Sequence, residues 1–351
     1  MSSTRSEQRP APAAAPARLW WRRLRLPLLI VAGLALAALG LWGRLPDPRQ
    51  FVGALADADY GWGSVAAALQ LASLAAFAWQ QRVLLHALGV RLTARRAGAV
   101  TLARTAISIS MPAGAAVSAG YAVREYQRAG AAKEIAAASM IVSGLTSIGG
   151  LTVLYVTGGL AVLGRNPALL LSPRPLAVVA GLAVATTAAI LVGRHLPAFK
   201  ATARRDGRVI RYVRGILTSA HEAWQAGAAL RARDWTAAVL FFAVNWLTDL
   251  LCLTATCRAV GLPVGVTTLA GIYLGVQIVR QVPLTPGGVG VVDTALVAGL
   301  TAAGATAATA AAAVLIYRLL SCWLLLPAGG AAALLLRRDA LRHRRPTVRT
   351  R

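Results

Sequence analysis

The sequence predicts an all-α integral membrane protein that crosses the bilayer several times. Of its 351 residues, 57% are hydrophobic and the mean hydropathy is +0.61, which is too apolar for an ordinary soluble protein. Several runs of about 18 or more apolar residues are long enough to span a bilayer. Two further apolar segments are interrupted by proline and glycine. We therefore expect about six full spans plus two broken, re-entrant segments, or eight spans in all, arranged as inverted repeats.

Charge supports the same class. The net charge is +25 and the isoelectric point about 11.7, which in a soluble protein would indicate nucleic-acid binding. Here the arginines lie between apolar runs, so they indicate membrane topology and anionic lipid headgroups instead. We expect no nucleic-acid partner.

The elements follow in order along the chain. Residues 1–25 are rich in Pro, Ala and Arg and are expected to form a disordered basic tail. The first apolar run, 26–43, is too long for the core of a signal peptide, so we interpret it as an uncleaved span. The other predicted spans cover residues 61–79, 135–163, 176–193, 234–257 and 306–336.

Polar segments connect these spans. Residues 80–104 and 124–134 are predicted as basic connections, and residues 337–351 as a basic C-terminal tail. The largest connection is 194–235. Its stretch 209–224 has apolar residues at helical spacing with arginines opposite, which predicts either an interfacial amphipathic helix or an ordinary solvated one. The predicted membrane domain as a whole covers residues 26–336.

The two broken segments are 105–122 and 267–300. Within the second, QIVRQVPLTPGGVGVVDT (277–294) combines prolines and glycines, so a helix from Thr267 should stop near Val282 and a new one start near Val289. Non-helical backbone at membrane depth requires surrounding protein or a water-filled cavity. Many transporters build their binding sites from such breaks. A plain loop between two spans is the alternative.

Arginine distribution sets the predicted orientation. Of the 37 basic residues, 30 lie in the two tails and in the connections 80–104, 124–134 and 194–235, against 5 in the remaining connections. By the positive-inside rule, both termini are cytoplasmic. Both flanks of 105–122 are then on one side, so this segment should enter the membrane and return. The predicted order along the chain is span, span, re-entrant segment and span. This order occurs twice, and the two copies have opposite orientations in the membrane.

Four charged residues fall within predicted membrane segments: Arg280, Asp293, Asp249 and Arg318. Such charges are rare because they are costly to insert. Two buried ion pairs that fix packing would explain them. A polar cavity for a lipid headgroup would explain them as well, since the planar arginine fork binds two phosphate oxygens, while the acids hold the arginines or receive an amine or proton. A turn at the break would bring Arg280 and Asp293 into one cavity.

The candidate substrate-binding residues are those four charges together with the residues at and beside the two breaks. They are Arg280, Asp293, Pro286, Gly287, Gly288, Gly290, Arg104, Pro112, Gly114, Asp249 and Arg318. Helix N-termini after Pro286 and Pro112 would add exposed N–H groups. The cysteines have no CxxC spacing and the histidines no metal-type spacing, so we expect no metal or cofactor. No Walker A, GxSxG or HExxH pattern is present, and we expect no enzymatic activity.

Two stretches resemble a known family. PLTPGGVGVVDTAL (283–296) resembles the P-x-x-PGG-x-G-x-x-E signature of the lysylphosphatidylglycerol synthase transmembrane family, whose domain is flippase-like. SMPAGAAVSAGYAVREYQRAG (110–130) resembles the earlier P-x-G segment of that family. The likeness covers roughly residues 30–336. Asp293 stands where the family usually has Glu, and the earlier segment lacks the acid often seen after its Gly.

The resemblance implies a bacterial inner-membrane protein that moves a phospholipid or related polar lipid between leaflets. Its partners would be membrane lipids with anionic headgroups, with a second copy of the chain or a lipid-modifying enzyme as further candidates. The chain ends soon after its last span, without the soluble aminoacyl-transferase domain of the full-length synthases, so we expect no synthesis of lysyl lipid. The alternatives are a non-transporting scaffold for a lipid- or glycan-modifying enzyme and an integral-membrane lipid-modifying enzyme.

Overall fold

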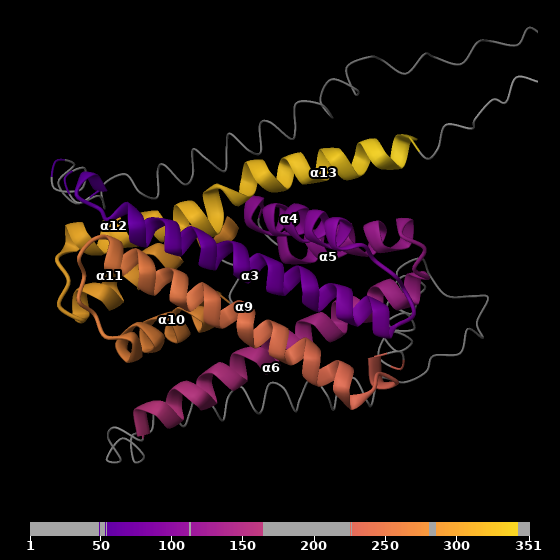
Figure 1. Ribbon diagram of the computed structural model, residues 1–351, viewed down its shortest axis with the longest axis horizontal. Coiled ribbons are helices and arrows are strands. Elements are labelled where there is room, and N and C mark those ends of the chain that lie inside the picture. The colour runs from indigo at the N-terminus through magenta and orange to yellow at the C-terminus, as the bar shows by residue number, and fades with distance from the viewer. Residues whose placement is uncertain are drawn as a thin grey trace, which may run out of the picture.

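The computed structural model describes Arg49, Gly53, residues 55–111, 114–163, Gln225, and residues 227–280 and 286–342, and regular structure in these ranges is helical throughout. The helices form an elongated bundle (Figure 1). The predicted tail 1–25, the spans 26–43 and 176–193 and the stretch 209–224 lie outside the described residues. The principal helices are α3 (Tyr60–Ala87), α4 (Ala94–Ser110), α5 (Gly114–Arg128), α6 (Lys133–Leu163), α9 (Ala232–Ala259), α10 (Val266–Arg280), α11 (Val291–Ala302), α12 (Ala307–Arg318) and α13 (Leu325–Arg342).

Four described helical segments are long and apolar enough to cross a membrane: Tyr60–Ala87, Lys133–Gly158, Ala232–Ala259 and Ala307–Leu341. They coincide with the predicted spans at 61–79, 135–163, 234–257 and 306–336, which confirms the polytopic helical fold class.

The helices extend beyond their apolar runs. The basic connection predicted over 80–104 is wrong, because α3 continues to Ala87 and α4 begins at Ala94, which leaves only residues 88–93 as a turn. The polar residues Gln80 and Gln81 are fully buried inside the bundle, so they continue the helix instead of ending it. Similarly, α5 runs to Arg128 and α13 to Arg342, past the predicted starts of the connection and the tail. Polar side chains at helix ends can reach the headgroup region while the backbone stays helical.

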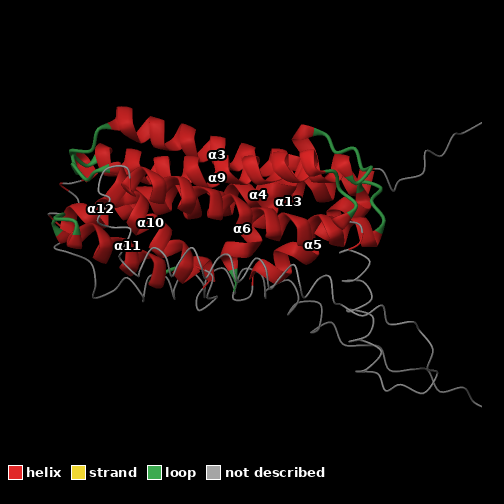
Figure 2. Ribbon diagram, turned by 90° about the horizontal axis from the view of Figure 1, so that it is seen from below, coloured by secondary structure: helices red, strands yellow, loops and turns green. Residues whose placement is uncertain are grey.

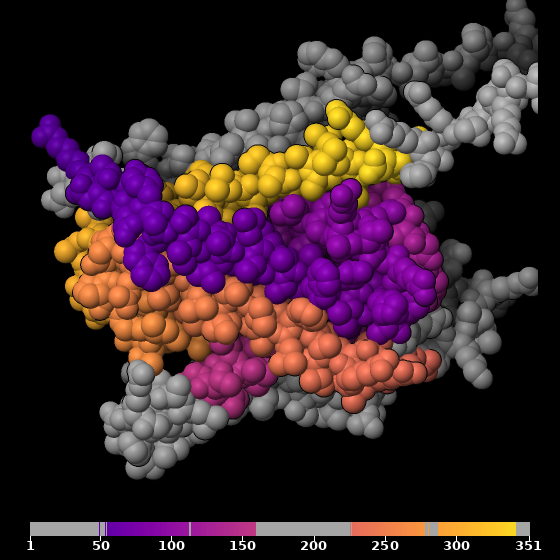
Figure 3. All heavy atoms as spheres, viewed as in Figure 1, coloured from indigo at the N-terminus to yellow at the C-terminus, as the bar shows by residue number. Residues whose placement is uncertain are grey.

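Helices α3 and α9 pack against each other in opposite directions at the centre of the bundle (Figure 3). At one end, the Asp59 N–H donates to the Ala259 carbonyl at 2.7 Å. At the middle, the Asn245 amide donates to the carbonyl and hydroxyl oxygens of Ser73 at 2.9 and 2.7 Å. At the other end, Leu84 and Ala238 share an apolar cluster.

One helical hairpin completes each half. Helices α4 and α5 form the first, and α10 and α11 the second. Their arms have 17, 15, 15 and 12 residues, or about 18–26 Å, which is short of the roughly 30 Å of bilayer hydrocarbon. The hairpins enter the bundle from opposite ends of its long axis (Figures 1 and 2). The arm lengths therefore favour two re-entrant segments over eight spans.

The tips of the two hairpins meet inside the bundle. The second tip contains one turn of 3-10 helix, η2 (Pro286–Gly288), which contacts α4. A Cβ atom at Gly287, whose φ is 60°, would lie 2.8 Å from Cγ2 of Ile109 near the end of α4. A Cβ atom at Gly114, the first residue of α5, would lie 2.3 Å from the Ser108 carbonyl oxygen. Gly287 lets the second tip pack against α4, and Gly114 lets the first hairpin turn tightly, since a larger residue would collide with the Ile109 side chain or with the Ser108 backbone.

The second half of the chain repeats the first in inverted orientation. Helices α3 and α9 have 28 residues each, and their first residues, Tyr60 and Ala232, lie as far apart in sequence as Ser73 and Asn245, namely 172 positions. The same offset separates the first residues of α4 and α10, Ala94 and Val266. Because α3 and α9 run in opposite directions, equivalent residues lie on opposite sides of the bundle centre. The described elements thus follow the predicted inverted-repeat order.

The last span joins the two hairpin regions. Between α12 and α13 the helix forms one turn of π-helix, η3 (Leu319–Trp323), a feature often found at functional positions. Beyond it, α13 packs along α4 (Figure 3). A Cβ atom at Gly329 would lie 2.5 Å from the Leu102 carbonyl oxygen, so a small residue is needed for this close helix contact.

Candidate functional site

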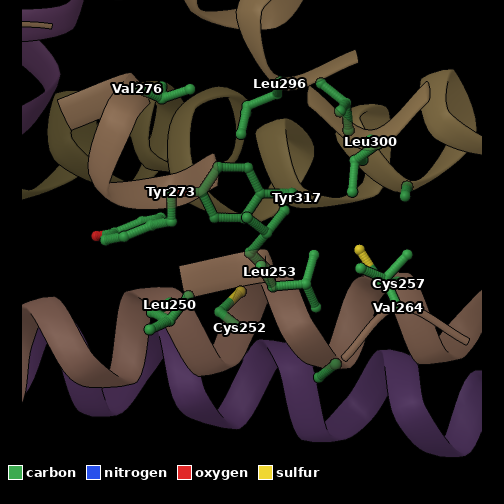
Figure 4. Packing of buried hydrophobic residues seen from close by; sticks show 14 of the residues in the cluster. Leu250, Cys252, Leu253, Cys257, Val264, Tyr273, Val276, Leu296, Leu300 and Tyr317 are labelled. Carbon is green, nitrogen blue, oxygen red and sulfur yellow. The ribbon is translucent and has the colours of Figure 1, made fainter. Parts of the chain in front are cut away.

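The first half of the site is built around Asp249 in the middle of α9. Its Oδ2 atom accepts hydrogen bonds from the Tyr273 hydroxyl of α10 at 2.7 Å and from the Tyr317 hydroxyl of α12 at 3.0 Å. Both tyrosines are buried, and Figure 4 shows them beside Leu253 and Cys252 within an apolar cluster. A buried carboxylate is tolerated when strong hydrogen bonds replace its hydration. The tyrosines therefore connect α10 and α12 to one carboxyl group of α9.

Arg280, the last residue of α10, faces the same carboxylate. Its Nη1 atom lies 3.9 Å from Asp249 Oδ2, an ion pair too long for a hydrogen bond. The Arg280 side chain is 30% exposed. Within the described residues, Asp249 is its one ion-pair partner, and no hydrogen bond joins its five N–H donors to another described residue.

The second half of the site joins Asp293 of α11 to Arg318 of α12. Asp293 Oδ1 and Arg318 Nε lie 2.7 Å apart, although the N–H bond does not point along this contact and the attraction is mainly electrostatic. Asp293 Oδ2 accepts the Gly290 N–H at 2.9 Å, and Arg318 Nη2 donates to the Gly287 carbonyl at 3.0 Å. Of the N–H groups expected to be exposed at the helix start after Pro286, that of Gly290 is therefore occupied by Asp293, which caps α11.

The predicted meeting of Arg280 with Asp293 is replaced by two other pairs. Arg280 pairs with Asp249 and Asp293 with Arg318, because α10 packs against α9 as well as α11, while α11 packs against α12. The pairs still belong to one cluster, since Tyr317 and Arg318 are adjacent in sequence and each binds one of the two acids.

The other candidates are distributed over both hairpins. Gly287, Gly288 and Gly290 have positive φ angles of 60°, 68° and 84°, a conformation that favours glycine and forms the tip. Pro286 starts the 3-10 turn. Gly114 starts α5 at the first tip. Pro112 lies outside the described residues.

Arg104 is separate from the charged cluster. It lies on α4 with its guanidinium carbon 4.9 Å from the centre of the Phe77 ring. No recorded contact joins it to Asp249 or Asp293, so the structure divides the candidate arginines between the two halves of the molecule.

Sequence reasoning missed Tyr273 and Tyr317. A signal was present for each: Tyr273 lies two helical turns before Arg280 and therefore on the same helix face, and Tyr317 directly precedes Arg318. Tyrosine is common in apolar helices for packing alone. Only the packing of α9 against α10 and α12 shows that both hydroxyls bind the carboxyl group of Asp249.

The family model for the lysylphosphatidylglycerol synthase transmembrane region matches residues 28–329, which is most of the chain. The chain belongs to this family. The match confirms the resemblance carried by the PGG-x-G segment and covers both hairpins. A search of curated proteins gave no match. Together with the spanning helices, membership establishes a multi-pass membrane protein of a family named for a lipid synthase.

Proposed function

We propose that this protein transports lipid, moving a phospholipid or related polar lipid between the leaflets of a bacterial inner membrane. The observation that carries the proposal is a half-buried arginine, Arg280, beside the point where two broken hairpins from opposite ends of the bundle meet. Broken helices and repeats related by inversion are a recurrent architecture of transporter sites near mid-membrane. Membership in a lipid-related family supports a lipid as the cargo.

The two ion pairs, Arg318 with Asp293 and Arg280 with Asp249, have different roles. The Arg318 side chain is 4% exposed and its donors contact Asp293 and the tip carbonyl of Gly287, so it holds the second hairpin closed. The Arg280 side chain is 30% exposed and loosely paired, so its fork is available to two oxygens of a lipid phosphate. Asp249 orients Arg280 and offsets its charge when no headgroup is bound. Tyr273 and Tyr317 fix the carboxylate.

This role requires binding and release without bond breaking, so we propose a transporter and not an enzyme. No ATP-binding motif is present in the sequence, and the free energy would come from the lipid gradient, a coupled ion or a partner. We further propose that both termini face the cytoplasm and that anionic lipids are its partners. A second copy of the chain or a lipid-modifying enzyme would be the protein partner.

Translocation of a fluorescent phosphatidylglycerol in proteoliposomes tests the proposal. We expect flux by the wild type, loss of flux in Arg280→Ala, and impaired flux in Arg280→Lys, which keeps the charge but loses the fork. Arg258, exposed at the end of α9, provides the matched control, and Arg258→Ala should transport normally. An Arg280→Ala protein that transports at the wild-type rate would remove Arg280 from the mechanism. A well-folded wild type without flux would instead support a scaffold.

A further inference from the structure

The pseudo-twofold axis that relates the two halves of the chain passes close to a hydrogen-bonded pair of residues. Ser73 and Asn245 are equivalent residues, 172 positions apart, and they bond to each other: the Ser73 hydroxyl donates to the Asn245 carbonyl at 3.1 Å, and the Asn245 amide donates back. A residue can contact its own equivalent only near the axis that relates the two halves. The site around Asp249 must therefore have a counterpart on the other side of this pair.

The counterpart is found by applying the same offset. Asp249 corresponds to Phe77, Tyr273 to Thr101 and Arg318 to Thr146. Asp249 and Phe77 each follow an axis residue by four positions on antiparallel helices. They lie about 6 Å from the axis in opposite directions, one in each half of the bundle.

An arginine faces this position in both halves. In the second half, Arg280 faces Asp249. In the first half, Arg104 lies over the Phe77 ring, with its guanidinium carbon 4.9 Å from the ring centre. The aromatic face attracts the cation but carries no net charge that would neutralise it. The offset relates Arg280 to Ser108, so the first half supplies its arginine from one helical turn earlier, and it has a phenylalanine in place of the acid.

Arg104 has no acid partner among the described residues, and its Nη1 atom is buried without a hydrogen bond. One helical turn earlier on the same face, Thr101 is 1% exposed and its hydroxyl is also unpartnered. Arg104 is half-buried, and a guanidinium whose inner nitrogen is desolvated without a counter-charge or acceptor is in an unfavourable environment. Two adjacent donors without acceptors indicate that an anionic acceptor belongs there.

The surroundings of Arg104 are rigid and polar. Tyr126 of α5 lies beside its guanidinium and donates its hydroxyl proton to Gln81 Oε1 at 2.9 Å. Gln81 in turn donates to the Ser143 hydroxyl at 2.5 Å, and Gln80 donates to the Thr146 hydroxyl at 3.1 Å. These residues are buried and come from three helices. Their bonds hold Tyr126 in place, so the arginine is positioned before any ligand arrives.

We propose that Arg104 and Thr101 form a second anion site, which binds the phosphate group of a phospholipid in the half of the bundle opposite Arg280. The proposal rests on the proposed function and extends it, because the two arginines become successive stations for one headgroup on its way between leaflets. The ligand class is a phosphate monoester or diester. Inorganic phosphate and a lipid headgroup share that chemistry and must be distinguished by experiment.

Equilibrium binding of radiolabelled phosphatidylglycerol to the purified full-length protein in detergent provides the test. We expect two saturable sites in the wild type, with one lost in Arg104→Gln and the other in Arg280→Ala. Affinity at the altered site should fall by about tenfold or more, as for loss of a charged hydrogen bond. Arg82, which lies 4.7 Å over Trp79 on α3, forms a similar arginine–aromatic pair. Arg82→Gln is the matched control and should retain both sites.

A second variant keeps the test valid if Arg104→Gln does not fold. Arg104→Lys keeps a positive charge over the Phe77 ring but loses the bidentate fork, so the protein should remain folded while the Arg104 site loses affinity. Inorganic phosphate as competitor identifies the source of the anion: displacement of the lipid assigns the site to any phosphate, and resistance assigns it to a lipid headgroup.

The outcomes separate this inference from the proposed function. Two undisturbed sites in folded Arg104→Gln or Arg104→Lys would overturn the second site and leave transport intact. A wild type without saturable binding would also overturn it. Two Arg-dependent sites in a protein without lipid flux would retain the second site and reject transport.

Discussion

Asp293 pairs with Arg318 of the last span at 2.7 Å, and not with Arg280 on the other arm of its own hairpin. This pair connects the tip of the second hairpin to the last span, whose later part, α13, packs along α4 of the first hairpin. Arg318 also holds the Gly287 carbonyl, so one buried guanidinium binds both the acid and the backbone of the tip. The break is therefore fixed by a long-range contact and not by local sequence alone.

Removal of Asp293 should destabilise the protein strongly. Asp293→Ala leaves the buried Arg318 without a counter-charge, at an expected cost of about 3–5 kcal/mol in the free energy of unfolding. Arg233→Ala breaks an exposed pair with Asp234 at 3.6 Å and should cost at most about 1 kcal/mol. Thermal unfolding in detergent compares the two variants. Equal unfolding temperatures for Asp293→Ala and the wild type would contradict a structural role for the pair.

The double variant Arg280→Ala with Asp249→Asn separates packing from recognition. Removing both charges leaves neither uncompensated, so protein abundance should recover relative to Arg280→Ala alone. Lipid translocation should not recover, because the guanidinium fork that we propose binds phosphate is absent. Abundance by immunoblot and flux in proteoliposomes are measured together. Restored flux would show that Arg280 serves packing only.

The two tyrosine hydroxyls should each contribute measurably to stability. Tyr273→Phe and Tyr317→Phe each remove a hydrogen bond to a buried carboxylate, and we expect a loss of about 1–3 kcal/mol in unfolding free energy per change. Tyr60 is 79% exposed, so Tyr60→Phe is the control and should be neutral. Chemical or thermal denaturation monitors the effect. If both buried variants match the control, the hydroxyls do not stabilise Asp249.

Gly287→Ala should disturb the contact between the hairpin tips. The φ angle of 60° costs about 1–2 kcal/mol for a residue with a Cβ atom, and that atom would lie 2.8 Å from Ile109. Adding Ile109→Ala should relieve the collision but not the backbone strain, so stability should return only in part. Gly144→Ala is the control, because nothing lies within 4 Å of its added Cβ. Full stability of Gly287→Ala would mean that the tips do not touch.

Cysteine labelling tests the two ends of the bundle. In a variant lacking Cys252, Cys257 and Cys322, a membrane-impermeant maleimide applied to intact cells should label Thr306→Cys but not Ala132→Cys. Both positions are exposed, and they lie in turns at opposite ends of the bundle. Ser2→Cys and Thr347→Cys should also be protected if both termini are cytoplasmic. Labelling at Ala132→Cys, or at either terminus, from outside would reverse the orientation.

The sequence alone predicted the spans that the structure describes, because membrane insertion depends on local hydrophobicity and length. It also predicted the break in the second hairpin, placing the helix end near Val282 and the restart near Val289, against Arg280 and Val291 in the structure. Proline and glycine act on the backbone locally, so their effect on a helix can be predicted without knowledge of the tertiary structure. The helix ends at Ala87 and Arg342 were missed because buried glutamines and basic residues resemble loop sequence.

The sequence also singled out the charges that lie in or beside apolar runs, since that position is a property of the chain. It could not determine their partners: Arg280 with Asp249, Asp293 with Arg318, and Arg104 with the Phe77 ring. Those pairings depend on which helix faces which after two inverted halves pack around Ser73 and Asn245. An ion pair is decided by distances of a few ångströms between segments far apart in sequence, and only the tertiary structure sets those distances.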